Sequence, residues 1–216
     1  MAFVEHGYHE RKRKEKMDRK REKKMKEKYH NEKTFERKDF SGDKMEEADF
    51  EACNFVACDF SEADLSLMDF IDCRFTDCNL SLAKLNGTLF QDCDFQDCKM
   101  LGLKFENCNA FGLKVQFHGC TLDHSSFYKA KMNQAVFSSC QLQGVDFTEA
   151  ELTGASFSDA DLQDAVFDRT NLEKSDFRNA RNFILDPERN NLKKSRFLRS
   201  DLAGLLHKYQ IEIDEV

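Results

Sequence analysis

The sequence predicts an all-β fold in which the chain winds into a four-sided solenoid. Two observations lead to this prediction. A large apolar residue (Phe, Leu or Met) recurs at every fifth position, and a small residue (Cys or Ala) usually stands two places before it. Five residues rotate an α-helix by about 500° and reverse the face of a flat strand, so neither element would bury the series on one side. A chain that turns a corner every five residues would bury it around a common axis.

The large residues, here called central residues, form two series. The first runs from Phe35 to Phe105, and the second from Phe117 to Phe177. Between them the pattern weakens at Ala110 and Val115 and resumes two places late, which predicts an irregular coil in the middle of the rod. With one strand spacing of about 4.8 Å per coil, some eight coils up to Leu202 would form a rod on the order of 40 Å long.

All nine cysteines stand at the small position, which strand alternation turns inward. Pairs that are 20 residues apart, such as Cys53 and Cys73, favour four sides per coil. At inward positions a free cysteine acts as a small hydrophobe, so we expect core filling and no metal site. A filled rod also lacks a groove, and the sequence has no Ser-His-Asp grouping and no glycine-rich phosphate loop. We therefore expect no enzyme activity and no cofactor.

Charge divides the chain into a basic arm and an acidic body. The whole chain has a net charge of −7, but residues 1–38 hold 15 basic and 8 acidic residues. No stretch approaches the roughly 20 apolar residues of a membrane span, and no apolar run follows the N-terminal charges as in a secretory signal. Nine cysteines without export favour a reducing, cytoplasmic location. We expect a basic arm at 1–33, a solenoid at 34–202 and a C-terminal segment at 203–216.

Repeating units such as Cys58-Asp59-Phe60-Ser61-Glu62 resemble the pentapeptide repeat family. The resemblance implies a right-handed quadrilateral β-helix. Within that family, the stretches 58–75 and 101–112 are similar to the Qnr and MfpA type of quinolone-resistance proteins. Those relatives bind DNA gyrase and topoisomerase IV as rod-shaped mimics of duplex DNA, and the Qnr members counter fluoroquinolones. Many Qnr members also carry two loops, whereas here the series continues without an insertion through 75–78 and 127–137.

The acidic body has a charge density near that of DNA. Residues 39–98 hold 15 acidic and 3 basic side chains, residues 99–145 hold 2 and 5, and residues 146–186 hold 10 and 4. An acid just before the central residue, as at Asp59, suits a turn because its side chain can bond to local backbone. The position three places further on is less constrained, and acids there predict a negative face in which Asp72 stacks over Asp92, and Asp77 over Asp97. The candidate partner-binding residues are Asp72, Asp77, Asp92, Asp97, Glu149, Asp159 and Asp164.

These features favour a non-enzymatic DNA mimic that binds gyrase or topoisomerase IV. The alternative is an interaction scaffold without a topoisomerase link. The basic arm would be a lone helix or a disordered segment, and it is the one region expected to contact nucleic acid directly. Apolar residues at the C-terminus would either cap the open end of the rod or form a homodimer. These are Leu202, Leu205, Leu206, Tyr209, Ile211 and Ile213.

Overall fold

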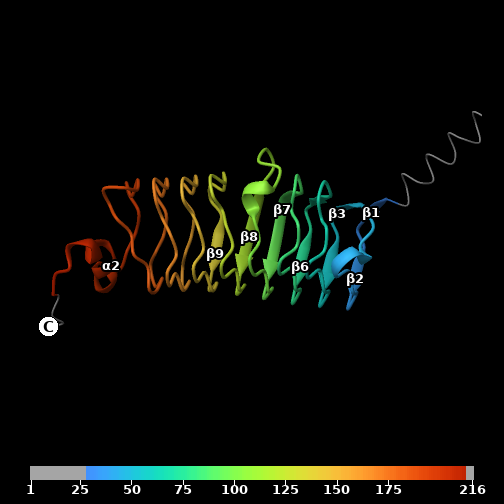
Figure 1. Ribbon diagram of the computed structural model, residues 1–216, viewed down its shortest axis with the longest axis horizontal. Coiled ribbons are helices and arrows are strands. Elements are labelled where there is room, and N and C mark those ends of the chain that lie inside the picture. The colour runs from blue at the N-terminus through green and yellow to red at the C-terminus, as the bar shows by residue number, and fades with distance from the viewer. Residues whose placement is uncertain (1–27, 213–216) are drawn as a thin grey trace, which may run out of the picture.

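The computed structural model describes residues 28–212 and shows a rod of stacked parallel coils (Figure 1). The first coils contain β1 (Tyr29–Asn31), β2 (Thr34–Glu36), β3 (Asp49–Glu51), β4 (Asn54–Val56), β5 (Asp69–Ile71) and β6 (Arg74–Thr76). The middle contains β7 (Leu89–Gln96), β8 (Lys114–His118) and β9 (Val136–Ser138). Short 3-10 turns lie at Gly42–Lys44, Phe105–Asn107, Arg199–Asp201 and His207–Tyr209, and the helix α2 spans Ala203–Leu206.

The register of the strands shows that each coil has four sides. Partners on neighbouring coils are 20 residues apart, as in Phe35 opposite Phe55 and Phe55 opposite Phe75. Since a central residue occurs every five residues, a coil of 20 contains four of them. The predicted four-sided solenoid is confirmed. One ladder of parallel bridges follows the rod through Asp39, Asp59, Asn79, Lys99, Thr121, Gln141, Asp161 and Arg181.

We number the four faces by the ladders that they carry. Face 1 carries β1, β3, β5 and the first half of β7, and face 2 carries β2, β4, β6, the second half of β7, β8 and β9. Because β7 continues around the corner between them, both ladders belong to one nine-stranded sheet. Face 3 carries the bridge ladder that starts at Asp39, and face 4 carries the bridges that start at Asp64.

The chain turns most corners through a residue in the left-handed region, two places after the central residue. Asp72 has φ 52°, Leu82 has φ 60° and Lys174 has φ 61°. Such a conformation is unfavourable for a residue with a Cβ. It is held because the corner amide donates to a carbonyl of the next coil, as Asp72 N does to Gln91 O at 2.9 Å. The backbone polar groups of the corner are thereby satisfied.

The core consists of phenylalanine rings stacked along the rod axis. Phe75 lies between Phe55 and Phe95 with centroids 4.7 Å away on either side and ring planes within 13° of parallel. Within a coil the rings meet edge to face, as Phe55 and Phe60 do at 74°. Such geometry adds about 0.5–1.5 kcal/mol per pair to the hydrophobic burial. The predicted inward direction of the central residues and the cysteines is confirmed, since all nine thiols are free and buried.

The predicted irregular coil lies where a loop leaves face 1. Asn109 still pairs with the preceding coil through Thr88 O, and then three residues, 110–112, bulge outward before Leu113 enters the core. β8 next omits one corner residue, because Gln91 pairs with Lys114 but Cys93 already pairs with Val115. Relative to a regular coil, the loop adds three residues and the missing corner removes one. The net gain of two residues explains why the central series resumes two places late. Phe111 at the tip of this loop is fully exposed.

The solenoid begins earlier than the expected start at residue 34. β1 pairs with β3 from Tyr29 onward, so residues 29–33 belong to the first coil. A histidine occupies the central position there, and the apolar series therefore did not reveal it. The ring of His30 packs 5.5 Å from Phe35 and 5.0 Å from Phe50, and burial lowers its pKa. The expected arm at residues 1–27 lies outside the described part of the chain.

We expect Phe137→Ala to destabilise the protein by about 3–5 kcal/mol, because it would remove a ring buried between Phe117 and Phe157. The change is measured as the shift in urea-induced unfolding followed by circular dichroism. Ser138→Ala is the matched control, since this neighbouring side chain points outward and its loss should cost less than about 0.5 kcal/mol. Equal effects of the two substitutions would contradict the stacked core.

We also expect stability to fall as the pH rises above about 9. Burial raises the pKa of Cys73 and of Cys108 to about 12, from an ordinary value of 9.0. Between these two values the unfolded chain loses thiol protons that the folded chain retains, so unfolding becomes more favourable. Each such thiol contributes about 1.4 kcal/mol per pH unit in this window. Urea midpoints at pH 7 and pH 10 measure the effect, and Cys73→Ala should reduce the slope.

Candidate protein-interaction surface

Four of the predicted acidic residues form two columns that flank face 2. Asp72 and Asp92 lie at the corner between faces 1 and 2, and Asp77 and Asp97 lie at the corner between faces 2 and 3. All four are exposed and have φ between 52° and 54°. The register of Ile71 with Gln91 places the two members of the first column one coil apart, as expected from the sequence.

The two columns differ in how their charge is balanced. Asp92 pairs with Lys114, whose pKa is raised chiefly by its hydrogen bond to that carboxylate. Asp97 instead lies against Gly119, where a Cβ would come within 2.3 Å of its Oδ1. Within residues 28–212, neither Asp77 nor Asp97 forms an ion pair. Within the described residues, no countercharge therefore balances the column at the corner between faces 2 and 3.

Two further acids strengthen the negative surface on face 1. Asp69 N donates to Asp49 Oδ1 at 3.2 Å, so the two carboxylates lie on neighbouring coils. Burial, and after it the negative charge of Asp49, raises the pKa of Asp69. The sequence assigned this position to turns. That role is confirmed at other coils. The carboxylate of Asp59 accepts a hydrogen bond at 2.9 Å, and that of Asp146 accepts one at 2.8 Å, in each case from the backbone N–H two residues later in the chain.

The three C-terminal acids do not join this surface. Glu149 lies between Lys129 and Arg169, at 3.4 Å and 2.9 Å, and the hydrogen bond from Arg169 is the main cause of its lowered pKa. Asp159 lies further along the corner between faces 2 and 3 and accepts a hydrogen bond from Ser158. Asp164 lies at the corner between faces 3 and 4. These residues therefore occupy three different corners.

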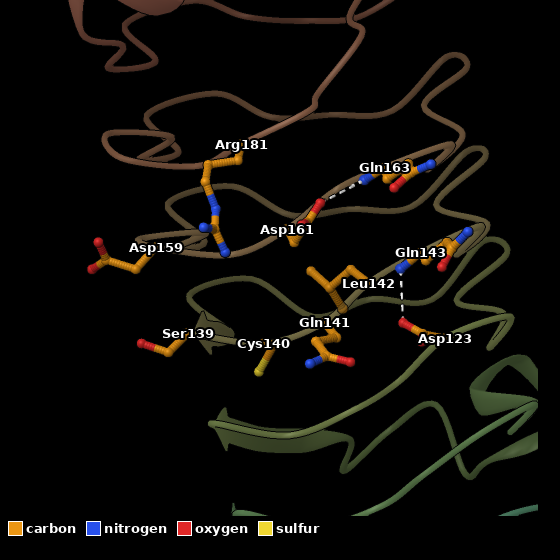
Figure 2. A pocket seen from close by; sticks show the side chains of 10 residues that line it. All are labelled: Asp123, Ser139, Cys140, Gln141, Leu142, Gln143, Asp159, Asp161, Gln163 and Arg181. Atoms are coloured by element: carbon orange, nitrogen blue, oxygen red, sulfur yellow. Dashed lines mark hydrogen bonds between the residues drawn. The ribbon is translucent and has the colours of Figure 1, made fainter.

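A shallow polar hollow lies on face 3 in the C-terminal half (Figure 2). The backbone N–H of Gln143 donates to the carboxylate of Asp123 at 2.9 Å, and the backbone N–H of Gln163 donates to the carboxylate of Asp161 at 3.2 Å. The side chain of Asp159 points away from Asp161. Throughout the described chain, no three His, Cys, Asp or Glu side chains lie close enough together to hold a metal ion. The hydrogen bonds of the hollow thus serve local structure.

The C-terminal segment closes the last coil and presents apolar side chains at the surface. Leu205 is half-buried against the core, and Leu185 N donates to Gly204 O at 3.0 Å. Lys208 lies 2.7 Å from both Asp186 and Glu188 and fastens the segment to the preceding coil. The remaining described members of the predicted cap are exposed, and Ile213 lies outside the described residues. The exposed members are Leu202, Leu206, Tyr209 and Ile211.

Comparison with known families matches most of the chain to repeat sequences. Residues 39–70 and 73–109 match the family described as pentapeptide repeats, and residues 113–206 match the pentapeptide repeat region family. No curated protein sequence matches the chain significantly. In the described residues, no helix has both the length and the apolar character needed to cross a membrane.

Solved structures with a similar fold include two trypsin-treated variants of QnrB1, which is described as a plasmid-mediated fluoroquinolone resistance protein. The first is 19% identical, covers 87% of this chain and 92% of its own, and has a TM-score of 0.55. The second is also 19% identical, with 86% and 100% coverage and a TM-score of 0.51. HetL, a pentapeptide repeat protein of the cyanobacterium Nostoc, is 14% identical with 77% and 85% coverage and a TM-score of 0.36. The likeness to QnrB1 shows a shared fold.

We expect Asp77→Asn to stabilise the protein by about 0.2–1 kcal/mol at low salt, because it would remove the repulsion between like charges on neighbouring coils. Asparagine tolerates the left-handed corner, so the substitution isolates the effect of charge. Thermal unfolding in 20 mM and 500 mM salt measures the gain. The gain should shrink at high salt through screening, and a gain that is independent of salt would contradict the electrostatic explanation.

Proposed function

The chain belongs to the pentapeptide repeat family, and on that premise we propose that it is a non-enzymatic mimic of duplex DNA that binds DNA gyrase or topoisomerase IV. The observation that carries this proposal is the pair of acidic columns along the two edges of face 2. A surface of this kind suits a protein cleft that normally receives the two phosphate strands of DNA. We assign recognition to Asp72, Asp77, Asp92 and Asp97, with Asp49 and Asp69 beside them.

The density of charge supports the proposal. Residues 39–98 carry 15 acidic and 3 basic side chains on about three coils, or about 14 Å of rod. One net negative charge per roughly 1.2 Å exceeds the density of duplex DNA, which is about one per 1.7 Å. The C-terminal half is a weaker mimic, because arginines and lysines already pair with its acids. We therefore propose that the N-terminal coils make the principal contact.

The likeness to QnrB1 supports the same proposal at the level of fold. QnrB1 is described as a fluoroquinolone resistance protein, and its rod has the same architecture. We extend the proposal to protection of the topoisomerase against fluoroquinolones, and to a homodimer through the exposed residues of the C-terminal segment. A general interaction scaffold has the same fold without this target, so direct measurement on the enzyme separates the two functions.

The test is a gyrase supercoiling assay with the purified full chain, with and without a fluoroquinolone. We expect inhibition of supercoiling by micromolar protein, and recovery of activity in the presence of the drug if the chain protects. A variant with lysine at Asp72, Asp77, Asp92 and Asp97 should lose at least about tenfold in potency, because like charges would then face the basic cleft.

The matched control replaces four acids elsewhere with lysine, namely Glu46, Glu62, Glu106 and Asp164, which flank or lie on face 4, opposite face 2. The control has the same net charge as the test variant and should retain the effect. Equal potency of the two variants would contradict recognition by the acidic columns. Absence of any effect of the folded wild-type chain would favour the scaffold.

A further inference from the structure

The corner between faces 1 and 2 changes its charge along the rod. The ladder of face 2 is continuous from one end to the other, and the corner residue stands two places before each of its rungs except Gln116, where the coil omits it. The corner begins with Glu32 and Ala52, continues with Asp72 and Asp92 and then with Gln134 and Gly154, and ends with Lys174 and Lys194. The rungs are Thr34, Asn54, Arg74, Asp94, Gln116, Val136, Ser156, Asp176 and Arg196.

Both lysines of this corner face solvent. Lys174 has a side chain that is 58% exposed, and its one ion pair is with the adjacent Glu173 at 3.6 Å. Lys194 is also exposed, and in the described chain it forms no ion pair. The two residues are 20 apart on one ladder, so they lie one coil apart, as Asp72 and Asp92 do.

The corner between faces 2 and 3 has a similar polarity over the coils from Arg74 to Arg196. It begins with Arg37 and Ala57, continues with Asp77 and Asp97, and then passes through Gly119, Ser139, Asp159 and Asn179. Arg199 stands two places after Phe197, where the 3-10 turn Arg199–Asp201 begins; it is exposed and, like Lys194, has no ion pair within residues 28–212. Over these seven coils, face 2 is therefore bordered on both sides by aspartates toward the N-terminus and by bases at the C-terminal end.

The surface between the two corners is compatible with close contact. Its central rungs carry small side chains, among them Val136, Ser138 and Ser156. The charged rungs are already paired within the chain, since Arg74 lies 3.5 Å from Asp94 and Arg196 lies 3.5 Å from Asp176. The loop at 110–112 leaves the chain on face 1, and its residue Phe111 lines a shallow hollow together with Asp92 and Lys114 at the corner between faces 1 and 2.

We propose that face 2 binds face 2 of a second copy of this chain, with the two rods antiparallel. A two-fold axis that lies in the interface and crosses the rods reverses their direction and keeps each corner against its own counterpart. With its centre at the rung of Val136, this arrangement places Asp72 opposite Lys194 and Asp92 opposite Lys174 of the second copy. On the other edge it places Asp77 opposite Arg199.

The alternative parallel arrangement is repulsive. A two-fold axis along the rods would place the corner between faces 1 and 2 against the corner between faces 2 and 3 at the same level. Asp72 would then face Asp77 of the second copy, and Lys194 would face Arg199. Juxtaposed like charges disfavour a complex. Both arrangements place rungs of like charge opposite each other, as the antiparallel pair does with Arg74 and Arg196, so the charges at the two corners are what select the antiparallel pair.

The size of the surface indicates a weak complex. Seven rungs about 4.8 Å apart and strands about 10 Å long give on the order of 700 Å² of total buried area, below the roughly 1,200 Å² of stable interfaces. Exposed ion pairs contribute modestly and are screened by salt. The dimer should therefore form at high protein concentration and low salt. Self-association would also cover the four aspartates to which we assign binding of the topoisomerase. This last consequence rests on the proposed function.

Sedimentation velocity of the full chain tests the inference, without any topoisomerase. We expect salt-dependent association in 20 mM salt between about 10 and 500 μM protein, and its loss in 500 mM salt, which leaves the monomer or the dimer proposed through the C-terminal segment. The double variants K174E/K194E and D72K/D92K should each associate at least about tenfold more weakly, whereas a mixture of the two should associate again because their edges become complementary. Both substitutions suit the left-handed corner, which holds Glu149 and Lys174 in the native chain.

The matched control is E62K/D164K, which changes the same number of charges at the corner between faces 3 and 4 and should associate as the wild type does. Zero-length carbodiimide cross-linking shows the orientation. Asp72 and Lys194 are six rungs, or about 29 Å, apart in one chain, so a cross-link between them joins two copies.

Recovery of that cross-link in the dimer band, and its loss in 500 mM salt, are the expected results. A monomer at 500 μM in low salt would overturn the inference. Association that persists unchanged in both double variants would overturn it as well, and would indicate contact through the C-terminal segment. Neither result depends on whether the chain binds gyrase.

Discussion

The backbone hydrogen bonds between successive coils determine the rest of this structure. Most corner amides donate to the coil that follows, so the 20-residue register is set repeatedly along the rod. Any residue type placed at one position of the repeat is therefore stacked on its equivalents, about 4.8 Å apart. In the interior the result is continuous stacks of phenylalanine and cysteine. At the surface the same register converts a periodic sequence into columns of charge.

Like charges that stack along a corner repel one another unless opposite charges alternate with them. Along the corner between faces 4 and 1, Lys129, Glu149 and Arg169 alternate in sign, and both contacts are ion pairs. Along the corner between faces 2 and 3, Asp77 and Asp97 have the same sign and no countercharge within residues 28–212. The fold tolerates both arrangements, since coil pairing supplies the larger part of the stability. In the second arrangement, the carboxylates have no countercharge within the described residues, so a basic partner could pair with them.

The interior could be read from the sequence because burial in this fold depends on residue size at a fixed period. The corner conformation could not be read in the same way. A step of five residues shows where the chain turns, but not that the residue two places after Phe70 adopts positive φ. The one available signal was a set of six glycines at the same position of the repeat, namely Gly42, Gly87, Gly102, Gly119, Gly144 and Gly154. His30 was missed because its ring fills a place that the apolar series assigned to larger residues. The pairing of Glu149 was missed because columns were followed only for acids.

The left-handed corner offers another explanation for the acidic columns, because aspartate tolerates positive φ better than most residues. That preference alone does not account for the distribution of charge. Equivalent corners hold Gly119, Ser139, Asn179, Lys174 and Lys194, so the conformation also accepts neutral and basic side chains. Asparagine would satisfy it without repulsion between coils. The conformation therefore does not explain why four aspartates occupy two adjacent coils while bases stand at the far ends of both edges of face 2. The proposed contacts with a basic partner and with a second copy of the chain would account for that distribution.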